Sequence, residues 1–188
     1  SSTEELKRRF KNAIYRMRRA IGSSAVVFND NYYRFNNSLD FEYDVLSFEQ
    51  NITQAEKESN IDHTIKLFET AVDLYKGPFL ADIDATWFSA ERQRYSNMYL
   101  ETLRKLYEIY LNRNLLEKAL EIIRLIIKNE PFNEEAYRNA MAIYHEFGNT
   151  AAIIRLFEQC KQQLAREYGL EPSEETVLYF NTLIQPSR

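Results

Sequence analysis

The sequence predicts a mainly α-helical protein with one β-hairpin near its N-terminus, and three observations support this prediction. The 188 residues include only four glycines and four prolines, and the hydrophobic fraction of 45% is sufficient for a buried core. From Asp44 onward, apolar residues recur at helical spacing. Residues 25–35 instead place β-branched and aromatic residues around a turn-forming sequence, which is typical of a hairpin.

The first predicted helix has two very different sides. It contains residues 6–22, LKRRFKNAIYRMRRAIG, of which seven are basic and none is acidic, although the chain has a net charge of −4. Thr3 or Ser2 can cap its start, and Gly22 ends it. On a helical wheel the apolar residues share one side and form a stripe. This apolar stripe consists of Leu6, Phe10, Ile14, Met17 and Ile21.

The opposite side of this helix carries side chains that suit nucleic acid. Arginine and asparagine make paired hydrogen bonds to guanine and adenine edges, and neighbouring cations suit phosphates. A solvated surface helix is the alternative explanation of such a basic run. The polar side and its borders comprise Arg8, Lys11, Asn12, Tyr15, Arg16 and Arg19.

Residues 25–35, AVVFNDNYYRF, are predicted to form two short strands around Asn29-Asp30-Asn31. A basic amphipathic helix followed by such a hairpin matches the order of the recognition helix and wing of a winged-helix domain. This order favours DNA binding over the solvated-helix alternative. It adds Asn31 and Arg34 of the hairpin to the predicted DNA contacts.

The remainder of the chain is predicted to be helical. One helix begins at Asp44 and a second near Asp62, and Gly77-Pro78 prevents the second from continuing. A long helix is expected from about Thr86, and a last one after Pro172. The helices expected between these points cover residues 86–112, 115–129, 133–147 and 150–168.

The later helices show an internal repeat. An offset of 34 residues places Asn114 on Gly148 and Ala119 on Ile153, and it also aligns Leu120 with Ile154 and Ile123 with Phe157. Thirty-four residues is the period of tetratricopeptide repeats, in which helix pairs stack to bury their apolar faces. We therefore expect a tetratricopeptide-like stack with a concave groove. Candidate groove residues for binding a protein or peptide are Tyr99, Tyr107, Tyr137 and Tyr144.

The sequence contains no recognisable catalytic or metal-binding pattern. His63 and His145 are far apart and lack metal-ligand spacing with each other or with Cys160. Cys160 falls on the apolar side of its helix, where a small buried hydrophobic residue is expected. We therefore predict no catalytic residue, no metal site and no cofactor, and a protein that is not an enzyme.

Composition also bears on the compartment and the partners. No apolar run reaches the roughly 18 to 20 residues that span a bilayer, and the single cysteine fits a reducing compartment, so we expect a cytoplasmic protein without membrane contact. Outside residues 6–22, 17 basic residues face all 28 acidic ones. We therefore expect the chain to have a basic tip, which meets a polyanion, and a separate acidic body.

Six stretches occur in a distinctive order. They are NAIYRMRRAIG, VVFNDNYYRFN, YDVLSFEQ, AVDLYKGPFLADI, WFSAERQRY and LAREYGLEPSEET. This order resembles the bacterial transcriptional activator domain family. Its members are regulators related to Streptomyces antibiotic regulatory proteins, in which an OmpR-type winged helix precedes a tetratricopeptide-like activator domain. The resemblance covers nearly the whole chain.

The resemblance implies promoter binding through the first helix and the wing, and activation through the helical domain. We expect two domains, residues 1–38 as the C-terminal part of a winged helix and residues 39–188 as the activator domain. The candidate partners are promoter DNA, RNA polymerase or other regulator domains, and a second copy in a homodimer. A complete winged helix needs strands and two further helices before residue 6, so the apolar stripe must pack on the hairpin, the helical body or a partner.

Two alternatives remain open from the sequence. One is a helical-repeat scaffold that binds a protein or peptide, with the basic helix only as a solvated surface. The other is a regulatory domain associated with an enzyme. DNA binding that weakens steeply with salt separates the regulator from the scaffold, because neutralised phosphates release counterions.

Overall fold

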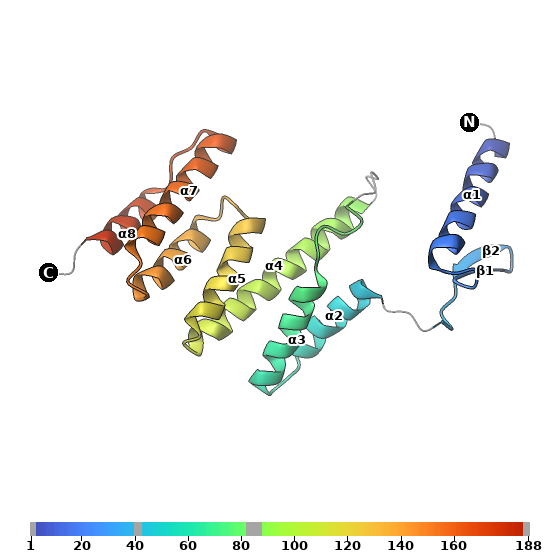
Figure 1. Ribbon diagram of the computed structural model, residues 1–188, viewed down its shortest axis with the longest axis horizontal. Coiled ribbons are helices and arrows are strands. Elements are labelled where there is room, and N and C mark those ends of the chain that lie inside the picture. The colour runs from blue at the N-terminus through green and yellow to red at the C-terminus, as the bar shows by residue number, and fades with distance from the viewer. Residues whose placement is uncertain (1–2, 40–42, 82–87, 186–188) are drawn as a thin grey trace. The chain divides into compact units, whose positions relative to one another are not determined.

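The computed structural model describes residues 3–39, 43–81 and 88–185. The chain divides into two compact units, Ser1–Tyr43 and Asp44–Arg188 (Figure 1). The described residues are mostly helical, with one two-stranded hairpin. This confirms the predicted fold class.

The first unit consists of a long helix and a hairpin. Helix α1 (Thr3–Ile21) is followed by strands β1 (Val26–Asn29) and β2 (Tyr32–Phe35), which pair antiparallel. Asp30 and Asn31 form the two-residue turn, with φ of 51° and 64°. A type I′ turn needs positive φ at both central residues, which aspartate and asparagine tolerate better than most residues. The predicted turn is therefore confirmed.

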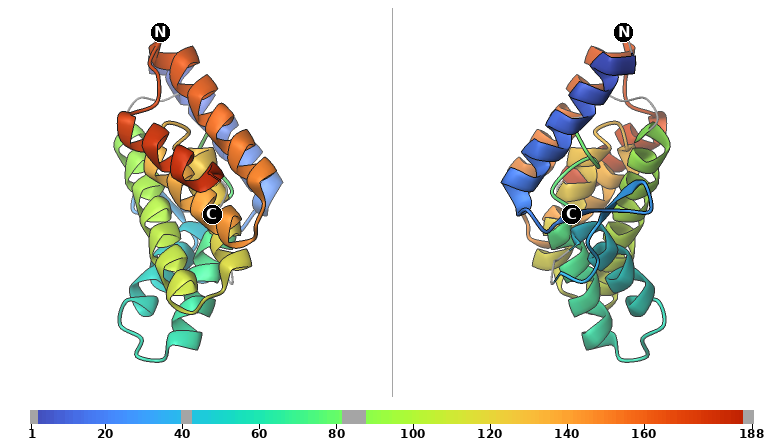
Figure 2. Two further views of the ribbon diagram at one scale, coloured as in Figure 1. Left: turned by 90° about the vertical axis from the view of Figure 1, so that its left-hand side faces the viewer. Right: turned by 90° about the vertical axis from the view of Figure 1, so that its right-hand side faces the viewer.

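The second unit consists of antiparallel helix pairs in succession, as Figures 1 and 2 show. Each helix packs on the next in the order of the chain, and the last helix packs on both members of the third pair. The predicted start of the long helix at Thr86, and Trp87, lie outside the described residues. The helices are α2 (Asp44–Ala55), α3 (Ile61–Leu74), α4 (Ser89–Asn112), α5 (Leu116–Asn129), α6 (Glu134–Glu146), α7 (Thr150–Tyr168) and α8 (Glu174–Ile184).

The 34-residue repeat is visible in the backbone of the α4–α5 and α6–α7 connections. Asn114 and Gly148 both adopt the left-handed conformation, with φ of 54° and 64°. In each connection the next amide donates to the carbonyl of a tyrosine at 2.8 Å, Tyr110 in the first and Tyr144 in the second. The predicted alignment of Asn114 with Gly148 is therefore confirmed at the level of hydrogen bonds.

The side chains follow the repeat less strictly than the backbone. Ala119 and its counterpart Ile153 are both buried, whereas Leu120 is buried and its counterpart Ile154 is 45% exposed. The difference fits the helix packing, because α5, which carries Leu120, packs on the long α4 and on α6, whereas α7, which carries Ile154, packs on α6 and on the short α8. The hydrophobic core joins α2 to α7, and Cys160 is fully buried within it, as its position predicted.

Candidate nucleic-acid interface

The six predicted DNA contacts of α1 lie together on one exposed face. Two shallow depressions run along this face, and they share Asn12. Arg8 and Lys11 line the first, and Tyr15 and Arg16 line the second together with Arg19. All six side chains are exposed. We call this surface the basic face; it consists of Arg8, Lys11, Asn12, Tyr15, Arg16 and Arg19.

The cations of the basic face are available to an external anion. Within the described residues, no carboxylate forms an ion pair with Arg8, Arg16 or Arg19. The neighbouring Arg9 differs, because its guanidinium pairs with Glu5 one turn earlier at 2.6 Å. The basic face therefore combines net positive charge with arginine donors that no described carboxylate occupies.

Arg18 has a structural role that the sequence analysis did not predict. Its Nε and Nη2 atoms donate to the carbonyl oxygen of Val26 at 3.0 and 2.6 Å, and this side chain is only partly exposed. The edge of the Phe10 ring also meets the ring of Tyr33, with 5.2 Å between centroids. These contacts fix the hairpin against α1.

The hairpin places its two candidate contacts differently. Asn31 lies exposed at the tip, in the turn. Arg34 follows Tyr33 directly in β2, so its side chain lies on the opposite face of the hairpin from Tyr33, the residue that contacts α1. The structure thus leaves both side chains exposed without directing Arg34 toward the basic face.

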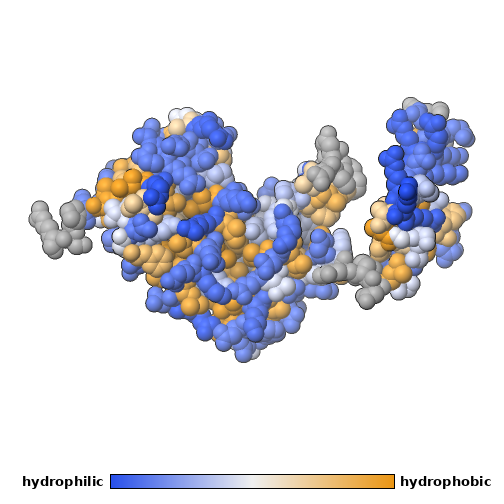
Figure 3. All heavy atoms as spheres, in the orientation of Figure 1, coloured by the Kyte–Doolittle hydropathy of each residue, from blue (hydrophilic) through white to orange (hydrophobic). Residues whose placement is uncertain are grey.

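The apolar stripe of α1 is mostly open in the first unit. Ile14 is 9% exposed, whereas Leu6 and Phe10 are 54% and 51% exposed. Met17 and Ile21 are also exposed. Figure 3 shows hydrophilic surface over the N-terminal part of α1 and hydrophobic surface gathered at the hairpin end of the unit. The hairpin therefore covers only part of the stripe.

The tyrosines proposed to line a groove lie elsewhere, with one exception. Tyr137 is fully buried, and Tyr99 and Tyr107 are 6% and 9% exposed. The groove prediction is therefore wrong for these three residues, because α4 and α6 are covered by neighbouring helices on both sides. Burial also raises the pKa of the Tyr107 and Tyr137 hydroxyls to about 12. Tyr144 lines a surface pocket.

His63 and Cys160, which were examined as possible catalytic or metal-binding residues, lie in an ion pair and in the hydrophobic core. His63 pairs with Glu58 at 2.5 Å next to the N-terminus of α3. Burial raises the pKa of the Cys160 thiol to about 11. No group of three or more potential metal ligands occurs among the described residues. No helix in the ranges 3–39, 43–81 and 88–185 has the length and apolar character needed to cross a bilayer.

Comparison with known families identifies the helical unit. A family model described as the bacterial transcriptional activator domain matches residues 43–183. The chain belongs to this family. The match begins one residue before α2 and ends within α8, so the bacterial transcriptional activator domain coincides with the second unit. The predicted family resemblance is confirmed.

A solved structure has a fold similar to that of this chain. The chain is similar to Mycobacterium tuberculosis EmbR, solved in complex with a low-affinity phosphopeptide, with a TM-score of 0.60 and 13% sequence identity. The alignment covers 97% of this chain and 51% of that chain, so this chain spans about half the length of EmbR. At this identity the likeness concerns the fold. Among curated proteins, none matches this sequence.

Proposed function

We propose that this member of the bacterial transcriptional activator domain family is a DNA-binding regulator that acts in the cytoplasm and is not an enzyme. In this proposal α1 and the hairpin recognise a promoter, and the helical unit supports activation through RNA polymerase or another regulator domain. The domain boundary is proposed between residues 38 and 39. The observation that supports the proposal most is the basic face, whose arginines have no carboxylate partner within the described residues.

The geometry of α1 suits the major groove. An α-helix fits that groove, and the side chains of its exposed face reach base edges while its borders reach phosphates. Arg8, Asn12 and Arg19 recur along the middle of the basic face, and Lys11 and Arg16 lie at its borders. The first three are therefore proposed to read bases and the latter two to bind phosphates.

The division of charge supports a contact limited to the first unit. Ser1–Tyr43 contains eight basic and five acidic residues, whereas Asp44–Arg188 contains 16 basic and 23 acidic residues. The helical unit therefore repels a polyanion while the first unit attracts it. A complete winged helix would also supply the apolar surface that the exposed stripe of α1 needs.

Selection of binding sequences tests the proposal. The full-length protein is incubated with a pool of random duplexes at about 50 mM salt, and bound duplexes are sequenced. We expect a defined sequence to be enriched. Asn12→Ala should relax the preference at one position, because removing a pair of hydrogen bonds to a base costs about 1–3 kcal/mol of discrimination.

The control variant is Asn129→Ala, which removes an asparagine side chain at the end of α5. It should leave the enriched sequence unchanged. If the wild-type protein retains no duplex at low salt, the DNA-binding proposal is wrong and a protein-binding scaffold becomes the better explanation.

A further inference from the structure

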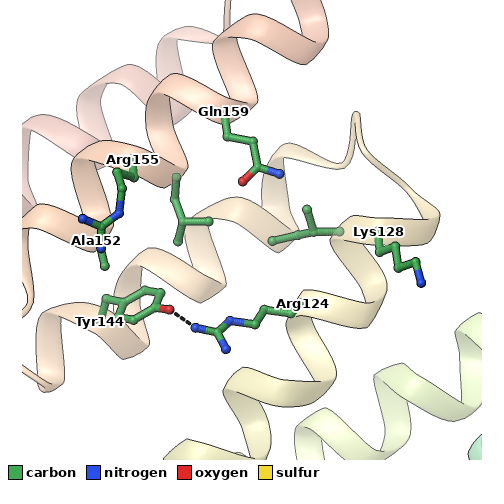
Figure 4. Close-up of a pocket in the computed structure, with 8 residues that line it drawn as sticks. Arg124, Lys128, Tyr144, Ala152, Arg155 and Gln159 are labelled. Carbon is green, nitrogen blue, oxygen red and sulfur yellow. Dashed lines mark hydrogen bonds between the residues drawn. The ribbon is translucent and has the colours of Figure 1, made fainter.

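The helical unit has a pocket that is separate from the basic face. It has a volume of about 510 Å³ and lies between α5, α6 and α7 (Figure 4). Its apolar part comes from Ile127 and Ala152, which are buried, and from the partly buried Leu156. The polar residues that line it are Arg124, Lys128, Tyr144, Arg155 and Gln159.

The pocket contains cations and no carboxylate. Arg124, Lys128 and Arg155 form no ion pair with any described residue, whereas several other cations of the helical unit do. Glu121 and Glu158 lie three residues from Arg124 and Arg155 on the same helices, yet they pair with neither. In Figure 4 the two arginines lie toward the end of the pocket that holds Tyr144, and Lys128 lies at the other end.

The preceding repeat shows how the same position is completed by the protein itself. Tyr110 is the counterpart of Tyr144, 34 residues earlier. Its hydroxyl donates to Oε1 of Glu69 on α3 at 2.6 Å, and Nζ of Lys118 donates to the same oxygen at 2.8 Å. This repeat therefore contains an internal carboxylate that joins a tyrosine and a cation.

In the next repeat the carboxylate is replaced by a cation. Glu69 is the ninth residue after Asn60, which precedes α3, and Arg124 is the ninth residue after Leu115, which precedes α5. Arg124 donates a hydrogen bond to the Tyr144 hydroxyl and lies 5.7 Å from the ring centroid. The position that holds an anion in one repeat is thus wholly cationic in the next.

We propose that this pocket binds a small organic phosphate. The phosphoryl group would lie between the guanidinium groups of Arg124 and Arg155, and the organic part would lie on Ile127 and Leu156. Two arginines and a lysine favour a phosphate monoester over a simple carboxylate, because the phosphate carries a charge of about −1.5 to −2 at neutral pH and offers three acceptor oxygens to the guanidinium groups. The volume is within the range for small ligands, and the acidic helical unit disfavours a long polyanion.

Titration of the complete chain with phenyl phosphate tests this proposal. Binding is followed at constant ionic strength by calorimetry and by the side-chain Nε–H NMR signals of arginine. We expect saturable binding, with shifts of the Arg124 and Arg155 signals. Arg155→Gln should weaken binding about tenfold or more, because it removes a charge-assisted hydrogen-bond donor.

Arg166→Gln is the matched control, since it removes the same charge from the same helix at an exposed residue that pairs with Glu167. It should leave the affinity within about twofold of wild type. The proposal is overturned if binding does not saturate, if the shifts occur at other arginines, or if Arg166→Gln weakens binding as much as Arg155→Gln. Tighter binding of benzoate would overturn the phosphoryl assignment, and tighter binding of an aspartate-rich peptide would overturn the small-molecule assignment.

Discussion

Arg18 and Val26 join α1 to the hairpin, because both Nε and Nη2 of the arginine donate to one carbonyl oxygen. Two donors from a charged group make this the strongest polar contact described between the helix and the strand. Arg18→Ala should therefore let the hairpin open locally. We expect hydrogen exchange of the Asn36 amide, which donates to the carbonyl oxygen of Ala25 next to Val26 at 2.8 Å, to accelerate about tenfold.

Arg9→Ala is the control for this prediction, because Arg9 pairs with Glu5 within α1 and does not contact the hairpin. It should leave exchange of the Asn36 amide unchanged. Equal exchange rates in wild type and Arg18→Ala would mean that the aromatic contact of Phe10 with Tyr33 is sufficient to hold the hairpin.

Substitutions at Asn31 test its role in the hairpin turn separately from its proposed role in DNA recognition. Its φ of 64° is tolerated by asparagine and favoured by glycine, but it is strained for a β-branched residue. Asn31→Gly should keep the strand register, while Asn31→Val should destabilise the hairpin by about 1–2 kcal/mol. The cross-strand NMR contacts of Phe28 with Tyr33 report the register, and their retention in Asn31→Val would contradict this account.

Leu103 tests the packing of the helical unit. It is fully buried in the core, so Leu103→Ala should lower the free energy of unfolding by about 2–5 kcal/mol. Leu178→Ala removes the same atoms from a side chain that is 58% exposed and should change stability by less than about 0.5 kcal/mol. Urea unfolding followed by circular dichroism measures both, and equal effects would contradict the assigned core.

Glu134 links α6 to α8 and gives the stability a dependence on pH. Burial tends to raise the pKa of its carboxyl, but hydrogen bonds from Thr176 and Ser173 outweigh burial and hold the pKa below the ordinary value of 4.5. The amide and hydroxyl of Ser173 donate to it at 2.9 and 2.8 Å. A lowered folded-state pKa means that this contribution is present above pH 4.5 and is lost as the pH falls through the folded-state value.

Glu134→Gln should therefore reduce the loss of stability between about pH 5 and pH 3, and at neutral pH it should cost about 1–2 kcal/mol. Glu135→Gln, which does not bond to Ser173, should follow the wild-type curve. Chemical denaturation at several pH values measures both variants. A Glu134→Gln curve parallel to wild type would show that this carboxylate does not contribute to the acid response.

The local features were predictable from the sequence because short-range rules determine them. The wheel of residues 6–22 identified the basic face and the apolar stripe, and the Asp30-Asn31 turn followed from the backbone preferences of those residues. The 34-residue offset identified the equivalence of Asn114 and Gly148. In each case a short stretch of sequence contains the whole pattern.

The features that depend on packing between helices were not predictable in the same way. Tyr99 and Tyr137 were predicted to line a groove, but neighbouring helices cover both, and helical spacing cannot show which side a third helix covers. Arg124 and Arg155 look like ordinary solvated cations in the sequence because they come together only through the packing of α5 on α6 and α6 on α7. The one signal available was the alignment of Tyr110 with Tyr144.

The salt dependence of DNA binding tests the central claim most directly. The affinity of the full-length protein for its selected duplex is measured between about 50 and 200 mM salt, for wild type and for a variant with Arg8, Arg16 and Arg19 changed to alanine. The slope of log K against log salt falls by about 0.9 for each phosphate that the variant no longer neutralises. The control is a variant with Arg104, Arg113 and Arg166 of the helical unit changed to alanine, which removes the same number of positive charges.

We predict that the basic-face variant binds more weakly and with a slope reduced by about 1 to 3, while the control keeps the wild-type slope. An unchanged slope in the basic-face variant, or an equal reduction in the control, would contradict the assignment of α1 as the DNA-binding helix.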